Sequence, residues 1–269
     1  MVSQQDSYRL TSCIKPPLKW AGGKRWLLPH LRLIWQKHSE KRLIEPFCGG
    51  LAVALGLSPE RAELNDINMH VVNFYRWLQK GLQIEIEMEN ERTLYYRQRD
   101  RFNDLIQSDQ GDSQEAAGLF YYLNRTGYNG LCRFNKKGKF NVPFGSYGQI
   151  NYIDDFSQYV SVMRGWHLNS GDFAQLEVKS NDFIYADPPY DVEFTQYAKE
   201  GFSWQDQIRL AQWLVDHAGP VVVSNQATDR ILDLYKSFDF QIEILDAPRM
   251  ISCTGDRTRS KEMLAMRGI

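Results

Sequence analysis

Short apolar runs alternate with amphipathic stretches along most of the chain. The apolar runs end in turn-forming residues and predict strands at 42–47, 63–66, 166–169, 182–186, 220–224, 241–245 and 262–266. Of these, 182–186 and 220–224 are predicted to be buried. Stretches with apolar residues at helical spacing predict helices at 25–38, 51–57, 154–163, 204–218 and 228–238. Strands and helices that alternate in this order predict an α/β fold built on a doubly wound sheet.

The pattern changes between residues 71 and 161. Apolar residues recur there at helical spacing, as at Val72, Tyr75 and Leu78, and strand-like runs are absent. We therefore predict a largely helical insertion in the sheet domain. The sheet domain would comprise 1–70 and 162–269, and the insertion 71–161 would form a second domain.

The composition is that of an ordinary soluble globular protein, with 43% hydrophobic and 24% charged residues in a chain of 269. No run is long enough to span a bilayer, and the N-terminus lacks a charged-then-apolar leader. We therefore expect a cytoplasmic protein with no membrane partner. The cysteines, Cys13, Cys48, Cys132 and Cys253, lack metal-ligand spacing. We interpret them as reduced thiols and expect no metal site.

The net charge of -1 does not by itself indicate a nucleic-acid partner, but the distribution of charge does. Residues 7–39 contain seven Lys or Arg residues and no Asp or Glu. Residues 125–141 contain five Lys or Arg residues and likewise no Asp or Glu. Such segregation favours a basic face that binds a polyanion. The alternative is an ordinary solvated surface, which charged runs also form.

Residues 42–66 have the order strand, glycine turn, helix, strand, acid. The turn is Cys48-Gly49-Gly50, and this geometry lets a nucleotide-like ligand approach the backbone at a helix N-terminus. Asp66 ends the second strand, where an acidic side chain commonly binds ribose hydroxyls. Upstream, Trp20 and Lys24 flank a Gly-Gly pair and offer a stacking face and a cation. The glycine spacing fits neither a P-loop nor a dinucleotide fingerprint, so the pattern indicates an adenosine ligand. The alternative is a plain strand-helix-strand unit.

The sequence Asp187-Pro188-Pro189-Tyr190 follows the predicted strand at 182–186. Because proline has no N–H to donate to a ladder, the sheet ends here, and α/β sheets bind ligands at this carboxyl edge. The turn offers a carboxylate, an aromatic ring, and backbone carbonyls that need not accept a hydrogen bond from a neighbouring backbone amide. These groups suit a planar ligand that carries an NH2 group. The alternative is a Pro-Pro turn with an N-capping aspartate.

The chemistry follows from the NH2 group, whose lone pair is delocalised into a heteroaromatic ring. Hydrogen bonds from it to Asp187 and the Pro188 carbonyl would localise the lone pair, so that the nitrogen attacks an electrophilic methyl group. Tyr190 would stack on the ring and fix its plane. Asp172 and Phe173, also just beyond a predicted strand, are candidates to hold an adenine amine and stack on its ring.

Residues 123–145 interleave aromatic, amide, basic and glycine residues. This composition suits phosphate contacts, base-edge readout and stacking, whereas the alternative is a polar loop over a helical core. The candidate DNA contacts in it are Asn124, Arg125, Asn135, Lys136, Lys137 and Lys139.

Together these motifs resemble those of Dam-type DNA adenine-N6 methyltransferases, the α-ordered group that uses S-adenosylmethionine. The resemblance runs from residue 18 to the C-terminus, with the motifs in the family's order. It covers the N-terminal cofactor motif at 18–24, the glycine turn at 45–50 and the catalytic motif at 187–190. Residues 123–135 and 140–145 resemble the recognition domain of GATC-methylating enzymes. The departures are the glycine spacing at Cys48-Gly49-Gly50, and Asp154 in place of a Pro- and aromatic-rich stretch.

The resemblance implies a Rossmann-like methyltransferase sheet with an inserted, mainly helical target-recognition domain. It implies that S-adenosylmethionine is surrounded by Trp20, Lys24, Phe47, Asp66 and Asp172. Phe173 and Asp187 are further candidates for cofactor contacts. The catalytic residues would be Asp187, Pro188, Pro189 and Tyr190, which act on N6 of an adenine flipped out of double-stranded DNA, in the sequence GATC. The residues that contact DNA would include Lys19, Tyr128, Asn129, Leu131, Arg133 and Pro143.

Two other interpretations remain open at this point. One is a methyltransferase that acts on a planar amide in protein or on RNA. The segment from Tyr128 to Arg133 argues against it, because its residues favour duplex DNA. The other is a non-catalytic DNA-binding protein with a degenerate methyltransferase fold. The intact residues 187–190 argue against it. We expect a monomer. The sequence leaves open the biological role, which could be restriction protection, repair marking, regulation or a phage function.

Overall fold

A computed structural model describes residues 14–191, 201–248 and 260–269. In these residues, seven strands form one sheet in the order β3-β2-β1-β4-β5-β7-β6. Strands β1 to β5 are parallel, and β7 lies antiparallel between β5 and β6. The strands are β1 (Leu43–Glu45), β2 (Ala62–Asp66), β3 (Trp166–Ser170), β4 (Phe183–Ala186), β5 (Val221–Gln226), β6 (Gln241–Ala247) and β7 (Ser260–Arg267).

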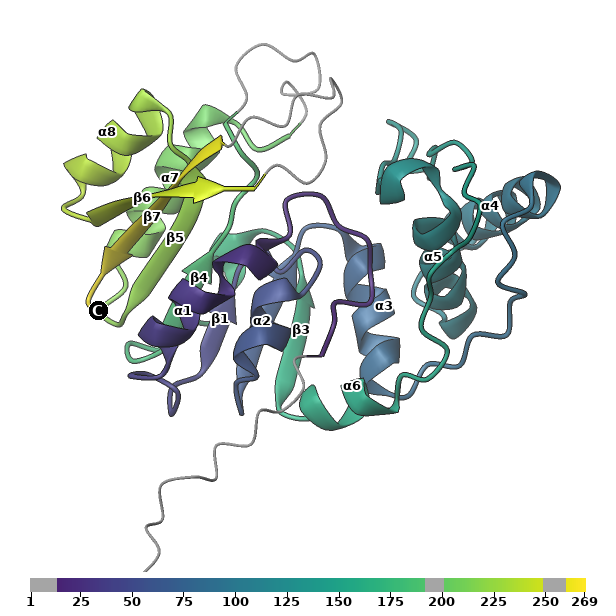
Figure 1. The fold of residues 1–269 in the computed structure, drawn as a ribbon, viewed down its shortest axis with the longest axis horizontal. Helices are drawn as coiled ribbons and strands as arrows, with labels where there is room; N and C mark the ends of the chain where they lie inside the picture. Colours follow the sequence, from purple (N-terminus) through teal and green to yellow (C-terminus); the bar gives the residue numbers. More distant parts are fainter. Residues whose placement is uncertain (1–13, 192–200, 249–259) are drawn as a thin grey trace, which may run out of the picture.

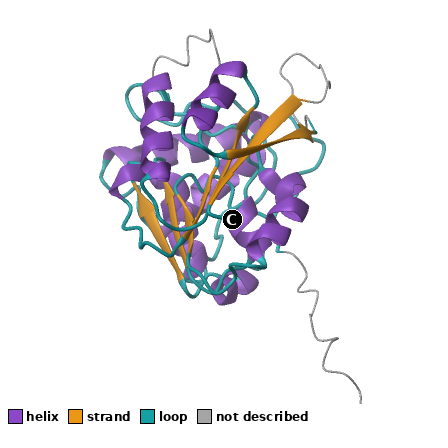
Figure 2. Cartoon of the chain, turned by 90° about the vertical axis from the view of Figure 1, so that its left-hand side faces the viewer, coloured by secondary structure: helices purple, strands orange, loops and turns teal. Residues whose placement is uncertain are grey.

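The central strands are buried on both faces. Every residue of β1 and β4 is buried, as are all but the last of β5, as expected of parallel strands that are covered on both faces. Helices cover the two faces of the sheet (Figure 2). Those on one face are α1 (Leu28–Trp35), α2 (Ala52–Leu57) and α3 (Met69–Gln79), and those on the other are α7 (Trp204–Val215) and α8 (Asp229–Ser237). The predicted α/β fold with a doubly wound sheet is confirmed.

The helical insertion lies beside β3 in Figure 1, beyond α3. Its helices are α4 (Arg92–Gln107) and α5 (Gln114–Thr126), and α6 (Ser157–Val162) returns the chain to the sheet. Residues 123–145, called here the recognition segment, contain one short 3-10 helix, η2 (Tyr128–Gly130). Isolated bridges pair Gly127 with Phe144 and Phe134 with Phe140, which fold the segment into a hairpin-like loop.

Helix α3 connects the sheet and the insertion. Arg76 donates two hydrogen bonds to the Leu168 carbonyl of β3, while the Tyr121 ring of α5 stacks on Phe74 at 5.5 Å. The predicted domain boundary after residue 70 falls inside this helix. The division into 1–70 with 162–269 and 71–161 stays a prediction.

The predicted helix at 25–38 differs from the structure. A 3-10 turn, η1 (Lys24–Leu27), precedes α1, which has Pro29 in its first turn and ends at Trp35. Proline lacks an N–H and fixes φ, so it is accommodated best where a helix begins. The sequence also predicts a polar, aromatic stretch with lid character at 191–203 and a basic loop at 249–259. Of these, residues 192–200 and 249–259 lie outside the described residues. No helix of the described chain is long and apolar enough to cross a bilayer.

Candidate active site

The glycine turn after β1 accommodates Trp20. A Cβ atom on Gly49 would lie 2.6 Å from Trp20 Nε1, and one on Gly50 would lie 2.7 Å from Trp20 Cβ. Gly49 also has a φ of +45°, which disfavours any side chain. The glycines therefore allow the indole to lie directly on the turn, where it forms part of a cavity wall.

Asp66 is held at the end of β2 by backbone amides. One carboxylate oxygen accepts from Gly49 N at 3.0 Å, and the other accepts from Asn68 N at 2.8 Å. Burial raises the pKa of Asp66, and these two amide hydrogen bonds oppose that rise. The carboxylate is thus fixed beside the glycine turn, as the sequence predicts for a ribose ligand.

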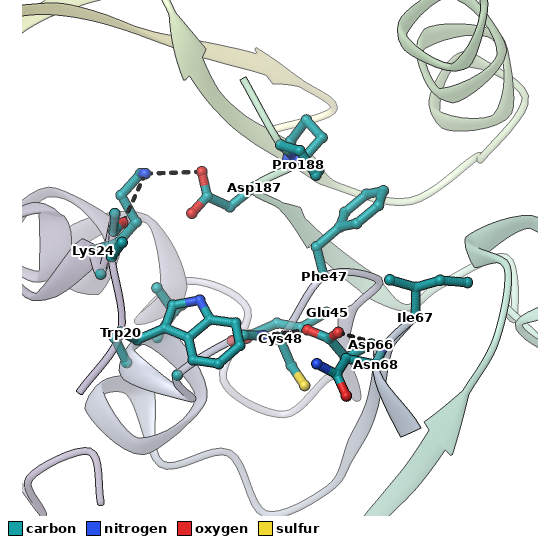
Figure 3. A pocket seen from close by; sticks show the side chains of 18 of the residues that line it. Trp20, Lys24, Glu45, Phe47, Cys48, Asp66, Ile67, Asn68, Asp187 and Pro188 are labelled. Carbon is teal, nitrogen blue, oxygen red and sulfur yellow. Dashed lines mark hydrogen bonds and ion pairs between the residues drawn. The ribbon is translucent and has the colours of Figure 1, made fainter. Parts of the chain in front are cut away.

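Asp187 lies directly beyond β4, at the start of the 187–190 turn. Its Oδ1 lies 2.9 Å from Lys24 Nζ and accepts a hydrogen bond of 2.9 Å from Ser224 Oγ on β5. Lys24 Nζ also donates to the Tyr190 hydroxyl at 2.8 Å and to the Gly22 carbonyl at 3.1 Å. Burial raises the pKa of Asp187, and the adjacent Lys24 ammonium opposes this shift. Figure 3 shows the Lys24–Asp187 pair at one end of the cavity and Asp66 at the other.

Two further carboxyl groups surround this pair. Glu262 on β7 places Oε2 3.7 Å from Lys24 Nζ. Glu45, at the end of β1, is buried, and its pKa is raised well above the usual value by burial and by the charge of Asp187. Glu45 Oε1 has no hydrogen-bond partner among the described residues, and the side chain lines the cavity. The site is therefore rich in acid and has Lys24 as a shared cation.

The cavity has a volume of about 540 Å³, within the roughly 300–1,000 Å³ of small-molecule sites. It brings together most of the residues predicted for the cofactor and the reaction. Those that line it are Trp20, Lys24, Phe47, Asp66, Asp187, Pro188, Pro189 and Tyr190.

Asp172 and Phe173 do not line this cavity. Asp172 forms a two-pronged ion pair with Arg209 of α7, at 2.7 and 2.8 Å, which holds the pKa of its carboxyl below the usual value. Phe173 packs behind the cavity wall, with its ring 5.5 Å from that of Phe47. Their predicted contact with the cofactor adenine stays a prediction.

The predicted DNA contacts fall into two groups. The first group forms hydrogen bonds within the protein. Asn124 accepts from the Lys19 N–H at 2.8 Å and donates to the Lys19 carbonyl at 2.9 Å. Lys19 Nζ donates to the Arg125 carbonyl at 2.8 Å, and the Arg125 guanidinium donates to the Asn151 carbonyl. These contacts fasten the N-terminal motif to the end of α5.

The second group is presented to solvent by the recognition segment. Tyr128 is 52% exposed and Leu131 37%, and Arg133 is exposed. The Arg133 guanidinium is oriented by Asn141, which accepts from Nε at 2.8 Å and from Nη2 at 3.1 Å. Asn129, with a φ of +52°, reverses the chain between Tyr128 and Leu131. The other exposed members are Asn135, Lys136, Lys137 and Pro143, and Lys139 is half-buried.

Sequence reasoning did not find Glu45, Ser224 or Glu262 as parts of the site. A usable signal exists for Ser224: it follows Val221-Val222-Val223 at the carboxyl end of a parallel strand, as Asp187 follows β4. Glu262 lies on an antiparallel strand, and its approach to Lys24 becomes visible only in the folded chain.

Comparison with known proteins identifies the family. The family profile of D12 class N6 adenine-specific DNA methyltransferases matches residues 20–251. The chain belongs to this family. It is 36% identical over 258 residues to the type II methyltransferase M1.LlaDCHI of Lactococcus lactis subsp. cremoris, covering 88% of this chain and 89% of the relative. It is 35% identical to the DNA adenine methylase of Vibrio cholerae, and the match covers 93% of this chain and 94% of the relative. It is 32% identical to the retron Ec67 DNA adenine methylase of Escherichia coli, with 93% and 90% covered.

The protein is therefore an S-adenosylmethionine-dependent methyltransferase that acts on N6 of adenine in DNA. The cavity fits this cofactor by charge, because S-adenosylmethionine has a net charge of +1, from a sulfonium, an ammonium and a carboxylate, and the surrounding carboxyl groups outnumber Lys24. The buried, unpartnered Glu45 Oε1 leaves an acceptor at the cavity wall for a bound donor. The predicted family, enzyme class and cofactor are confirmed.

Proposed function

We propose that this methyltransferase modifies the adenine of GATC in duplex DNA after that adenine has left the base stack. The observation that carries the proposal is the position of the 187–190 turn. Its carboxylate and both prolines line the cavity, and Cys132 of the recognition segment lines the same cavity. Cys132 lies between Leu131 and Arg133, so residues suited to base contacts adjoin the mouth of the reaction site.

The cofactor residues divide between the two ends of the cavity. Asp66 accepts hydrogen bonds from the ribose hydroxyls, and Trp20 and Phe47 provide apolar walls. The Lys24 ammonium is directed to Asp187 and Tyr190, so its role is to keep Asp187 ionised rather than to bind the cofactor directly. When bound, S-adenosylmethionine supplies a methyl carbon made electrophilic by the attached sulfonium.

The 187–190 turn prepares the target nitrogen. The Asp187 carboxylate and the Pro188 carbonyl each accept one hydrogen of the N6 amine, which localises the nitrogen lone pair towards the methyl carbon. Tyr190 stacks on the adenine ring. As the bond from N6 to the methyl carbon forms, the bond from that carbon to the sulfonium sulfur would break, with S-adenosylhomocysteine as the leaving group. Positive charge develops on N6, and the buried carboxylate stabilises it more strongly than it would in water. The extra proton on N6 then passes to water.

Sequence recognition is assigned to the exposed side chains of the recognition segment. Arg133, held in plane by Asn141, donates two bonds to O6 and N7 of a guanine in the major groove. Leu131 and Pro143 suit contact with a thymine methyl group, and Lys136, Lys137 and Lys139 contact phosphates. The GATC assignment is supported by the resemblance of residues 123–135 and 140–145 to the recognition domains of GATC-methylating enzymes. One chain carries both the cavity and this segment, so we propose that it acts as a monomer in the cytoplasm.

The proposal is tested by sequencing methylated adenines in DNA from cells that lack adenine methylation and express either the wild-type chain or Asp187→Ala. We expect N6-methyladenine in GATC with the wild type. Asp187→Ala should lower kcat by roughly 100- to 1,000-fold, as loss of one transition-state contact does, while cofactor and DNA affinity persist. Methylation at other sequences would contradict the GATC assignment. A wild-type single-turnover rate for Asp187→Ala would contradict the role of the turn.

A further inference from the structure

A chain of buried amides joins the 187–190 turn to the neighbouring strand. Gln207 of α7 is fully buried and donates from Nε2 to the Pro189 carbonyl at 2.8 Å. Gln207 Oε1 accepts from Nδ2 of Asn225, a fully buried residue of β5, at 3.2 Å. Asn225 Oδ1 accepts in turn from Gln226 N at 2.8 Å. The Gln207 side chain is therefore fixed at both its amide nitrogen and its amide oxygen.

Strand β5 holds the turn from both faces of the sheet. Ser224 and Asn225 are consecutive, so their side chains point to opposite faces. Ser224 Oγ bonds to Asp187 Oδ1 on the face where it also meets the Tyr185 hydroxyl, at 2.8 Å. Asn225 lies on the face covered by α7 and reaches the Pro189 carbonyl through Gln207.

The prolines make such an external restraint necessary. Pro188 and Pro189 have no N–H, so half of the turn residues cannot donate a backbone hydrogen bond. Their rings fix both φ angles and leave the two ψ angles as the soft dihedrals. A hydrogen bond donated to the Pro189 carbonyl restrains ψ of Pro189. This angle orients the peptide bond between Pro189 and Tyr190 and therefore determines where Tyr190 lies.

We propose that Gln207, supported by Asn225, is a positioning residue for methyl transfer. It holds the Pro189 carbonyl away from the target amine, so that Asp187 and the Pro188 carbonyl present the two acceptors in the required geometry. Gln207 does not line the cavity, so it acts through the turn and not on the cofactor or the base. The inference rests on the proposed role of the 187–190 turn.

Gln207→Leu tests the inference, because leucine fills a similar volume and donates no hydrogen bond. We expect the single-turnover rate on a GATC duplex to fall roughly 10- to 100-fold, the loss that a displacement of about 1 Å in a reacting group causes. The dissociation constants of S-adenosylmethionine and of the duplex should change less than about threefold, since Gln207 contacts neither.

Gln207→Glu gives a second readout that a merely structural role would not produce. A protonated glutamic acid can donate to the Pro189 carbonyl and still accept from Asn225, whereas the carboxylate cannot donate. The ratio of the variant rate to the wild-type rate should therefore rise as the pH falls. Taking the ratio removes the titration of Asp187, which both proteins share. This readout remains available if Gln207→Leu fails to fold.

Two controls on the same helix separate positioning from stability. Gln212→Leu is the same substitution at an exposed position that bonds Asp216, and it should leave the rate unchanged. Leu210→Ala removes a fully buried apolar side chain of the core cluster under α7, which donates no hydrogen bond to the turn, so it is the control for a loss of Tm. A wild-type rate for Gln207→Leu, a flat pH ratio for Gln207→Glu, or an equal loss of rate in Leu210→Ala would overturn the inference. The proposed function itself fails separately, if Asp187→Ala remains active.

Discussion

At the scale of single residues, the charge of the site depends on Lys24. Its side chain is 3% exposed, and its three N–H groups meet three acceptors, on Gly22, Asp187 and Tyr190. Burial alone would favour a protonated, neutral Asp187, in which one oxygen carries an O–H donor in place of a carboxylate acceptor. The Lys24 ammonium offsets this effect and favours the carboxylate. The active form of the turn is therefore a property of the pair and not of Asp187 alone.

Lys24→Met should move the acidic limb of the pH–rate profile to higher pH. The pKa of Asp187 is raised by burial and lowered by Lys24, so removal of the cation leaves burial unopposed and raises that pKa further. The rate then falls at a pH where the wild type is still active. A neighbouring opposite charge is worth about 1–3 pH units. The measurement is the single-turnover rate against pH at saturating cofactor, with Lys179→Met, an exposed lysine, as the control. An unchanged limb would show that Lys24 does not set the ionisation of Asp187.

At the scale of elements, local patterns predicted the strands of the sheet well because each is a short apolar run that ends in turn residues. The 187–190 turn and Asp66 were found for the same reason, since polar residues after a parallel strand lie at the ligand edge. The contacts of Gln207 and Glu262 could not be found, because they join residues 18 and 238 positions apart and depend on how α7 and β7 pack. The break between η1 and α1 was missed because apolar periodicity continues through Pro29.

The recognition segment yields the next prediction. Arg133→Ala should relax discrimination at one guanine of the target by roughly 1–3 kcal/mol, because a guanidinium makes two parallel bonds that no single donor replaces. Arg133→Lys keeps the charge and should keep most of the DNA affinity, yet it should lose similar discrimination. Competition between GATC duplexes and duplexes with one altered base pair measures both quantities. If both variants keep the wild-type preference, the base contact belongs to another residue.

At the scale of the whole molecule, the near-neutral net charge of -1 conceals a separation of charge by position. The cavity gathers Asp66 and Asp187 at the carboxyl edge of the sheet, where they suit a cationic cofactor, and the buried Glu45 lies beside them. The recognition segment carries exposed Lys and Arg residues, where phosphates would lie. This arrangement is the one expected if the cavity binds the methyl donor and the recognition segment contacts the DNA. Cys132 belongs to the recognition segment and also lines the cavity, so the segment and the cavity adjoin there.

In the proposed function, the target base crosses from the surface into the interior. A paired adenine keeps N6 in the major groove, bonded to thymine, whereas the Asp187 side chain is only 21% exposed within the cavity. We therefore predict that 2-aminopurine at the target position of a GATC duplex gains fluorescence on binding, because an unstacked base is less quenched. The same base placed two pairs outside GATC should show little change. Tyr128 is 52% exposed on the recognition segment. If its ring fills the vacated stack, as we expect, Tyr128→Ala should weaken the fluorescence gain. A bound, active enzyme that leaves the fluorescence of the target-site probe unchanged would contradict base flipping.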